Sequence, residues 1–310
     1  MKKRILSFIL VMCLIVPCVM MLTACHEHSM TSIGFVYDEQ ESVVYQHPKC
    51  EHCDHGDLSL KEATEYIAVS TSEELKNALG TNQTLVLFED ITISNEIDGN
   101  GKAKNLYAIN GKNIVLYLNG HNITATAAPT ANNNYSVFDV AGSGSLEVYG
   151  KGTISLTHTG TDMQWNALSA VIQARTGAVK INKGVSVIHN GGTAMAYAVD
   201  VNTTSGTATL DFNGDLLKSS YVVVRIFNNH ATAAGVVTIN GGDVVSGSGS
   251  KTCVWVHYPN SNPHPAAQIT LNSGRYLGTD GSVGRVSCNV ADNVTVAEGV
   301  EVTRFNNDEE

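Results

Sequence analysis

Several features that identify common protein classes are missing from this 310-residue chain. It has no basic patch, and its 29 acidic residues outnumber 19 basic ones to give a formal net charge of −10. Because an acidic chain repels phosphate groups, nucleic acid is not expected as a partner. The chain also has no glycine-rich phosphate loop, no dinucleotide-binding fingerprint and no ordered serine or lysine triad. The sequence therefore predicts neither nucleotide binding through such a loop or fingerprint nor hydrolysis by such a triad.

Residues 1–24 predict an export signal. Three basic residues, Lys2, Lys3 and Arg4, precede an apolar run over residues 5–22. The run is almost long enough to span a membrane, but Pro17 lies inside it and argues against a permanent helix.

The apolar run ends in Leu22-Thr23-Ala24-Cys25, which resembles the lipobox of bacterial lipoproteins. The resemblance implies cleavage before Cys25 and attachment of lipid, including palmitate, to its thiol. The mature protein is then anchored to the outer face of the cell membrane. Removing residues 1–24 leaves 16 basic and 29 acidic residues, a net charge of −13.

Residues 25–64 form a Cys/His-rich stem, because five of the 11 histidines and one close cysteine pair lie between residues 26 and 60. Cys50 and Cys53 are separated by two residues, so one tight turn can direct both sulfurs at a single ion. A zinc site, a Cys50–Cys53 disulfide and a polar tether all remain open for this stretch.

The order of these residues, His-x-His followed by His-x-x-Cys-x-x-Cys, resembles short Cys/His modules in surface proteins of anaerobic Gram-positive bacteria. By that resemblance zinc would be the cofactor, and its ligands would be His28, His47, Cys50 and Cys53, with His52 or His55 as substitutes.

The next region, residues 65–305, opens with a short helix. Thr71 and Glu74 fit a capping box, Leu75 and Leu79 form an apolar stripe, and Gly80 ends the helix. We expect this helix to cover the end of the domain that follows.

That domain consists of repeats in which an alternating apolar strand leads into an Asn-Gly type of turn. The equivalent positions recur every 27 to 33 residues, which is typical of repeat folds, and they are Asn119, Tyr149, Asn182, Asn213, Asn240 and Asn272. A second strand of about five residues precedes each of the later motifs. Residues 306–310 form an acidic tail.

The varying repeat length favours a parallel β-helix over a sandwich or barrel, because extra residues can bulge at a corner without disturbing the stacked strands. In its repeat form the chain resembles right-handed parallel β-helices of the pectate-lyase-like kind. The fold class is therefore predicted to be all-β, a right-handed single-stranded β-solenoid with an N-terminal capping helix.

Aligning the second strands places Asp139, Gln173, Asp200 and Arg225 at one outward position. Two carboxylates with an arginine, Asp139, Asp200 and Arg225, are the catalytic candidates for a polysaccharide lyase, which would also need calcium, or a glycosidase. Within residues 65–305, the calcium-binding aspartate cluster of the lyases and the paired-aspartate, His-Gly and Arg-x-Lys signatures of the hydrolases are absent. Solvated surface residues are the competing interpretation.

Two further expectations concern cysteine and histidine. Cys253 and Cys288 fall in equivalent strands of the last coils and form a disulfide candidate if their α-carbons come within about 7 Å. Single histidines near turns are interpreted as solvated surface; they are His121, His158, His189 and His230.

The sequence therefore favours a lipid-anchored surface protein whose β-helix binds polysaccharide or a surface partner. A polysaccharide lyase or glycosidase and a metal-handling lipoprotein are the alternatives.

Overall fold

The computed structural model describes residues 30–50, 55–160, 167–192, 194–203, 205–228, 234–257, 267–288 and 290–305. The predicted signal segment, Cys25 and the tail 306–310 lie outside these ranges. The chain divides into two units at the boundary between Glu65 and Tyr66. None of the helices within the described ranges is long and apolar enough to cross a membrane.

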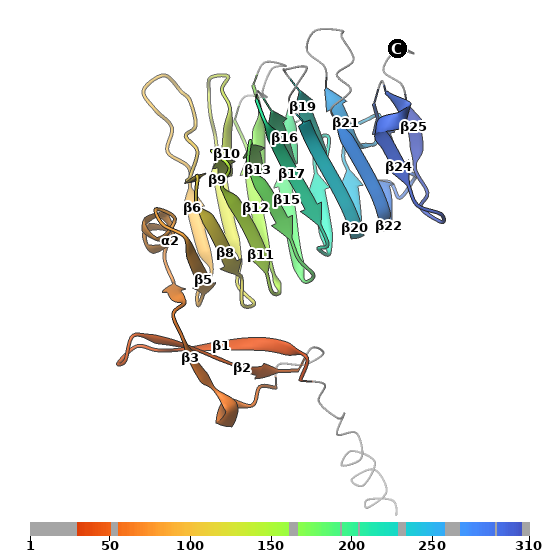
Figure 1. Cartoon of the computed structure of the whole chain (residues 1–310). Helices are drawn as coiled ribbons and strands as arrows, with labels where there is room; N and C mark the ends of the chain where they lie inside the picture. The colour runs from red at the N-terminus through yellow and green to blue at the C-terminus, as the bar shows by residue number, and fades with distance from the viewer. Residues whose placement is uncertain are drawn as a thin grey trace, which may run out of the picture. The chain divides into compact units, whose positions relative to one another are not determined.

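The first unit is a small antiparallel sheet in the order β1-β2-β3 (Figure 1). Its elements are β1 (Ser32–Asp38), β2 (Val43–Lys49), the 3₁₀ turn η1 (Leu58–Leu60) and β3 (Glu62–Thr64). Among its described residues, Phe35, Val44 and Cys50 are the buried hydrophobic side chains, whereas Ile33 and Leu60 are 55% and 59% exposed. The hydrophobic core of this unit is therefore thin.

The second unit is a β-solenoid of about 6 turns, and the chain as a whole is 58% strand. One side is an eight-stranded sheet whose neighbours are all parallel. Its strands, in chain order, are β7 (Tyr107–Asn110), β10 (Tyr135–Ala141), β13 (Ser169–Arg175), β16 (Ala196–Thr203), β19 (Val224–Asn228), β21 (Thr252–His257), β23 (Arg285–Ser287) and β25 (Thr303–Phe305).

The other two sides are arms of one fourteen-stranded sheet. The β8 arm contains β4 (Ile67–Val69), β5 (Gln83–Leu87), β8 (Asn113–Tyr117), β11 (Ser145–Tyr149), β14 (Ala178–Ile181) and β17 (Thr207–Phe212). The β9 arm contains β6 (Ile91–Ser94), β9 (Ile123–Ala127), β12 (Gly152–His158), β15 (Val185–Asn190) and β18 (Leu216–Ser219). The long strands β20 (Ala234–Ser246) and β22 (Gln268–Gly278) join the arms; η2 (Ala291–Asn293) and β24 (Val294–Val296), which pairs with β22, follow.

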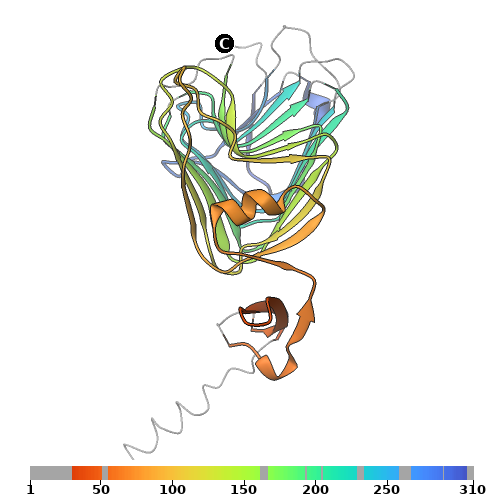
Figure 2. The ribbon, with the colours of Figure 1, turned by 90° about the vertical axis from the view of Figure 1, so that its left-hand side faces the viewer.

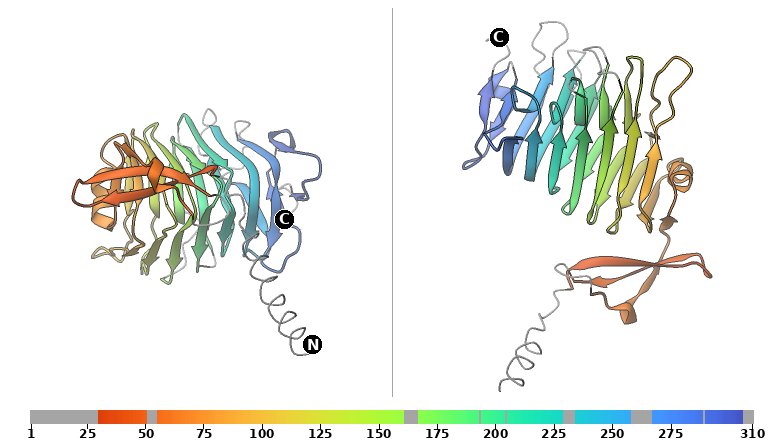
Figure 3. Two further views of the ribbon diagram at one scale, coloured as in Figure 1. Left: turned by 90° about the horizontal axis from the view of Figure 1, so that it is seen from below. Right: turned by 180° about the vertical axis from the view of Figure 1, so that it is seen from behind.

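Each coil contributes one strand to each side, so β10, β11 and β12 make one turn and β13, β14 and β15 the next. Figure 3 shows the coils stacked side by side along the unit. Within β11, Leu146 and Val148 point into the buried core while Glu147 between them is partly exposed. This alternation is the period of two expected from a strand with one buried face, and the predicted parallel β-solenoid is confirmed.

The predicted capping helix is also confirmed, as α2 (Ser72–Ala78). Thr71 and Glu74 form both hydrogen bonds of the capping box, and Leu75 and Leu79 are buried in the core. Figure 2 shows α2 lying across the first coil of the solenoid. It therefore covers apolar side chains that a further coil would otherwise bury.

The repeat register differs from the sequence alignment at Asn119. Tyr149 pairs with Tyr117, so the residue equivalent to Tyr149 in the preceding coil is Tyr117 and not Asn119. Asn119 lies two residues further on, in a turn with a φ of 52° followed by Gly120 with a φ of 90°. Its amide donates to the carbonyl of Leu87 at 3.1 Å. The coil that contains β8 thus has a longer path between strand and turn, which the Asn-Gly pattern concealed.

The predicted disulfide between Cys253 and Cys288 is wrong, because no bond joins them. Strands β21 and β23 pair with Trp255 opposite Ser287, so the two cysteines lie three positions apart along the strand direction. That offset is about 10 Å at 3.3 Å per residue, beyond the reach of a disulfide. The thiol of Cys253 instead donates to the carbonyl of Val244 at 3.3 Å.

Candidate functional site

A row of side chains crosses the eight-stranded sheet at one position per coil. Asp139 pairs with Gln173, Gln173 with Asp200, Asp200 with Arg225 and Arg225 with Trp255. The stacking predicted from the aligned repeats is therefore confirmed for its first four members. Trp255, which pairs with Arg225, extends the row by one coil.

The row lies on the outer face of the sheet. Ile172, Val199 and Val224, which alternate with it, belong to the hydrophobic core. On the row's own face Arg175 is exposed and Trp255 is partly exposed. Asp139, Gln173, Asp200 and Arg225 are themselves buried, so they are not the solvated residues of the competing interpretation.

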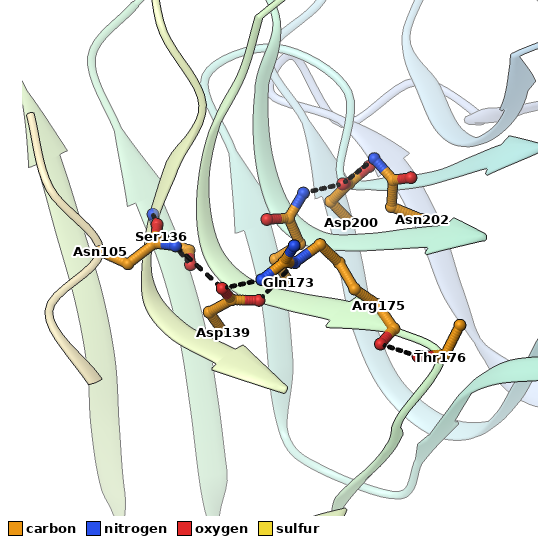
Figure 4. A network of polar contacts seen from close by, with 8 residues as sticks. All are labelled: Asn105, Ser136, Asp139, Gln173, Arg175, Thr176, Asp200 and Asn202. Carbon is orange, nitrogen blue, oxygen red and sulfur yellow. Dashed lines mark hydrogen bonds and ion pairs between the residues drawn. The ribbon is translucent and has the colours of Figure 1, made fainter. Parts of the chain in front are cut away.

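Asp139 is held by an arginine from the next coil (Figure 4). Arg175 donates from Nε to Oδ1 of Asp139 at 2.7 Å and from Nη2 to Oδ2, a bidentate pair. Asn105 donates to the same Oδ2 at 2.9 Å. The hydrogen bonds to Asp139 raise the pKa of Arg175, so this guanidinium stays charged.

Asp200 has the same kind of environment one coil further along. Arg225 donates from Nε to its Oδ1 at 2.6 Å, and Gln173 donates to Oδ2 at 2.9 Å. The amide of Asn202 adds a longer contact of 3.4 Å to Oδ2. Burial is the largest single influence and acts to lower the pKa of Arg225, but the charges and hydrogen bonds of Asp200 and Tyr197 together outweigh it, and the pKa is raised.

Both carboxylates are therefore occupied at each oxygen. A general acid or base has to exchange a proton with its substrate, whereas both oxygens of Asp139 and of Asp200 already accept hydrogen bonds from neighbouring side chains. Strand β13 separates them, which places their α-carbons about 9.6 Å apart at 4.8 Å per strand. This geometry fits two ion pairs buried in the outer face of the sheet better than it fits a catalytic acid and base.

An aromatic cluster adjoins these ion pairs at the later coils. The guanidinium carbon of Arg225 lies 4.6 Å from the ring centroids of both Tyr197 and Phe227. The rings of Trp255 and His257 are stacked at 4.2 Å with an interplanar angle of 10°, and Phe227 meets His257 edge-on at 5.1 Å. Burial, followed by the charge of Arg225, lowers the pKa of His257 to about 4.

No protein-family model, curated protein or solved structure matches this chain.

The aromatic cluster was not predicted from the sequence. Phe227 pairs with His257 in the register, so a second outward row two residues after the first brings these rings together. The aligned strands already indicated this second row, because Phe227 comes two residues after Arg225 and His257 comes two residues after Trp255. We call Phe227, Trp255 and His257, with the neighbouring Asn202, the aromatic end of the outer face.

The outer face of the β8 arm carries a second ladder, of tyrosines and asparagines. Tyr66, Tyr117 and Tyr149 are stacked at centroid distances of 6.1 and 5.1 Å. Further along the arm, Asn272 donates to Oδ1 of Asn240 at 2.8 Å, and Asn240 donates to Oδ1 of Asn213 at 3.0 Å. Asn182 holds the equivalent position one coil before Asn213, because each directly follows a member of the Ile181–Phe212 pair. Because the tyrosine rings cover one another's faces, this ladder joins coils and offers little ring surface to a ligand.

His158 and His189 are buried, which corrects their interpretation as solvated surface. The hydroxyl of Tyr135 is hydrogen-bonded to Nδ1 of His158, and Oγ of Ser169 lies 2.9 Å from Nε2 of His189. His189 pairs with Leu156, an inward core position. Burial, with a smaller effect from His158, lowers the pKa of His189 to about 3. His121 is half-buried 3.6 Å from Asp90, and His230 lies outside the described residues.

Two of the four predicted zinc ligands lie in the described part of the stem. His47 and Cys50 are both buried, and the imidazole of His47 packs against the backbone of Gly34 and Gly56. His28, Cys53 and the substitute His52 lie outside the described residues. Within the residues that are described, no group of three or more His, Cys, Asp or Glu side chains is placed to hold a metal ion.

Proposed function

We propose that this chain is a lipid-anchored surface protein whose β-helix binds an extended carbohydrate chain. The observation that carries the proposal is the outer face of the eight-stranded sheet, where ion-paired, amide and aromatic side chains follow one another in register. Asp139 and Asp200 are buried there and accept hydrogen bonds from neighbouring side chains, so the partly exposed amide and rings beside them are what the face offers to a ligand.

The repetition of the face supports an extended ligand. The exposed or partly exposed side chains of the outer face, Arg175, Asn202, Phe227 and Trp255, come from four successive strands, which at about 4.8 Å per strand span about 14 Å. A linear polymer lying along the solenoid axis can contact several coils at once. Binding sites for uncharged groups usually combine packing on aromatic rings with a few hydrogen bonds to polar groups such as side-chain amides.

The binding proposal is tested with the purified protein on a panel of immobilised cell-wall and host polysaccharides. We expect retention by at least one of them, and loss of that retention in an Asn202→Ala, Phe227→Ala double variant. A Tyr149→Ala variant, altered on the β8 arm, is the matched control and keeps binding. Absence of retention on every polysaccharide contradicts the proposal.

A polysaccharide lyase or glycosidase is the alternative, acting through Asp139, Asp200 and Arg225. The same incubations, with and without calcium, separate the two functions. A binding module leaves the polymers intact, whereas an enzyme releases unsaturated products or new reducing ends that Asp139→Asn and Asp200→Asn abolish.

The lipid anchor at Cys25 belongs to the same proposal and rests on the lipobox resemblance. Growth of expressing bacteria with labelled palmitate is expected to label the wild-type chain and not a Cys25→Ala variant. Equal labelling of both proteins would refute the anchor.

A zinc-binding stem is a second candidate function, favoured by its thin core. A unit this small usually needs a metal, a disulfide or a partner for stability. The backbone N–H of Cys50 donates to the carbonyl of His55 at 2.8 Å, so these two residues on either side of Cys53 in the sequence lie close together. Zinc analysis of the wild type against Cys50→Ser, with Cys253→Ser as control, is expected to show one ion lost only in the first variant; a metal-free wild type excludes the idea.

A further inference from the structure

Resting on the proposed carbohydrate binding, we infer that the aromatic end of the outer face, centred on Trp255, binds uncharged sugar units and discriminates against uronic acids. Three properties of that surface lead to this ligand class: its charge balance, its fixed rings and its hydrogen-bonding groups.

Charge balance argues against an acidic glycan. Each guanidinium of the two rows is paired with a carboxylate, Arg175 with Asp139 and Arg225 with Asp200. The four charges cancel, so a uronate arriving here meets cations that are already neutralised. The whole chain carries a formal charge of −10, which adds a general repulsion of polyanions. A neutral sugar suffers neither penalty.

The rings are held in place before any ligand arrives. Trp255 stacks on His257, His257 meets Phe227 edge-on, and Phe227 lies over the guanidinium of Arg225. All three aromatic side chains remain partly exposed. Rings fixed by their neighbours lose little conformational freedom on binding, so the C–H faces of a sugar can pack on them at a low entropic cost.

Polar atoms beside the rings suit hydroxyl groups. Nδ1 of His257 is buried without a hydrogen-bond partner among the described residues, which is unfavourable for a polar group. Asn202 is partly exposed, and its amide makes one long contact of 3.4 Å. A sugar hydroxyl both donates and accepts, so it can satisfy an imidazole nitrogen and an amide in turn. A carboxylate can only accept.

The test measures binding of soluble hexasaccharides to the purified protein by titration calorimetry. Neutral probes are the hexaoses of cellulose, xylan, mannan and laminarin, and acidic probes are the hexamers of galacturonate and mannuronate. We expect binding of at least one neutral probe, with at least 10-fold weaker binding of both acidic ones. Raising NaCl from 50 to 500 mM is expected to leave the neutral affinity within 2-fold.

Variants locate the site. Trp255→Ala is expected to weaken neutral binding at least 10-fold and Trp255→Phe, which keeps a ring and guards against misfolding, by less than about 3-fold. Tyr149→Ala, on the β8 arm, is the control and binds as the wild type does. If acidic probes bind as well as neutral ones, or if Trp255→Ala binds normally, the inference is overturned while carbohydrate binding stands. If no glycan of either kind binds, the proposed function fails with it.

Discussion

Arg225 donates from Nε to Oδ1 of Asp200 at 2.6 Å, and both side chains are buried. The two residues are direct neighbours across strands β16 and β19, so the contact connects two coils on the outer face. Gln173 connects Asp200 to the preceding coil. The row therefore acts as a set of cross-links along the solenoid, and it also fixes the surface on which the aromatic end lies.

Replacing Arg225 by Met is expected to destabilise the β-helix by about 3–5 kcal/mol, because it leaves the carboxylate of Asp200 buried without its partner. Adding Asp200→Asn is expected to recover much of the loss. Denaturant unfolding of the single and double variants measures the coupling.

The matched control is Arg275→Met. Arg275 is paired with Asp243 at 2.7 Å, but its side chain is 72% exposed. Water screens a pair of this kind, so its loss is expected to be far smaller. Equal losses for Arg225 and Arg275 would show that burial of the first pair has no energetic consequence.

The asparagine ladder provides a second prediction. Asn240 donates to Asp211 at 2.8 Å and to Asn213 at 3.0 Å, and it accepts from Asn272. Asn240→Ala removes all three contacts and is expected to cost about 1–3 kcal/mol of unfolding free energy. Asn77→Ala, at an exposed position of α2 outside the ladder, is the comparison and is expected to cost less. An Asn240→Ala variant as stable as the wild type contradicts a stabilising role for the ladder.

The solenoid and the row were predictable because both depend on a period in the sequence. Stacked coils place equivalent residues side by side, so aligning strands was enough to bring Asp139, Gln173, Asp200 and Arg225 together. The capping box at Thr71 and Glu74 was predictable for a local reason, since its hydrogen bonds involve residues three apart.

Features that depend on side-chain direction could not be predicted in the same way. The partner of Asp139 is Arg175, which comes from the next coil and the second outward row, and its choice depends on rotamers. The burial of His189 was detectable, because it continues the inward alternation of Val185 and Val187. The nearby turn concealed this, since turn residues are usually exposed.

The cysteine geometry gives a third prediction. Burial raises the pKa of the Cys253 thiol to about 12, so the reactive thiolate is scarce at pH 8. Iodoacetamide at that pH is expected to leave Cys253 unmodified in the folded protein and to alkylate it in guanidinium, as read by peptide mass spectrometry. Labelling of the folded protein, or an oxidised peptide joining Cys253 to Cys288, counts against the structure.

The buried histidines predict how stability depends on pH. In the unfolded chain histidine titrates near 6.5, whereas burial lowers the pKa of His189 to about 3 and that of His257 to about 4. Between pH 6.5 and about 4 the unfolded state therefore binds more protons, and the unfolding free energy falls as the pH falls, by about 1.4 kcal/mol per unit for each histidine. His189→Gln is expected to reduce that slope by one such contribution in denaturant titrations from pH 7 to 4. Ser169→Ala removes the hydrogen bond to Nε2 of His189 but no titrating group, so it is expected to lower stability equally at every pH; a slope unchanged by His189→Gln would mean that His189 is not neutral in the folded protein.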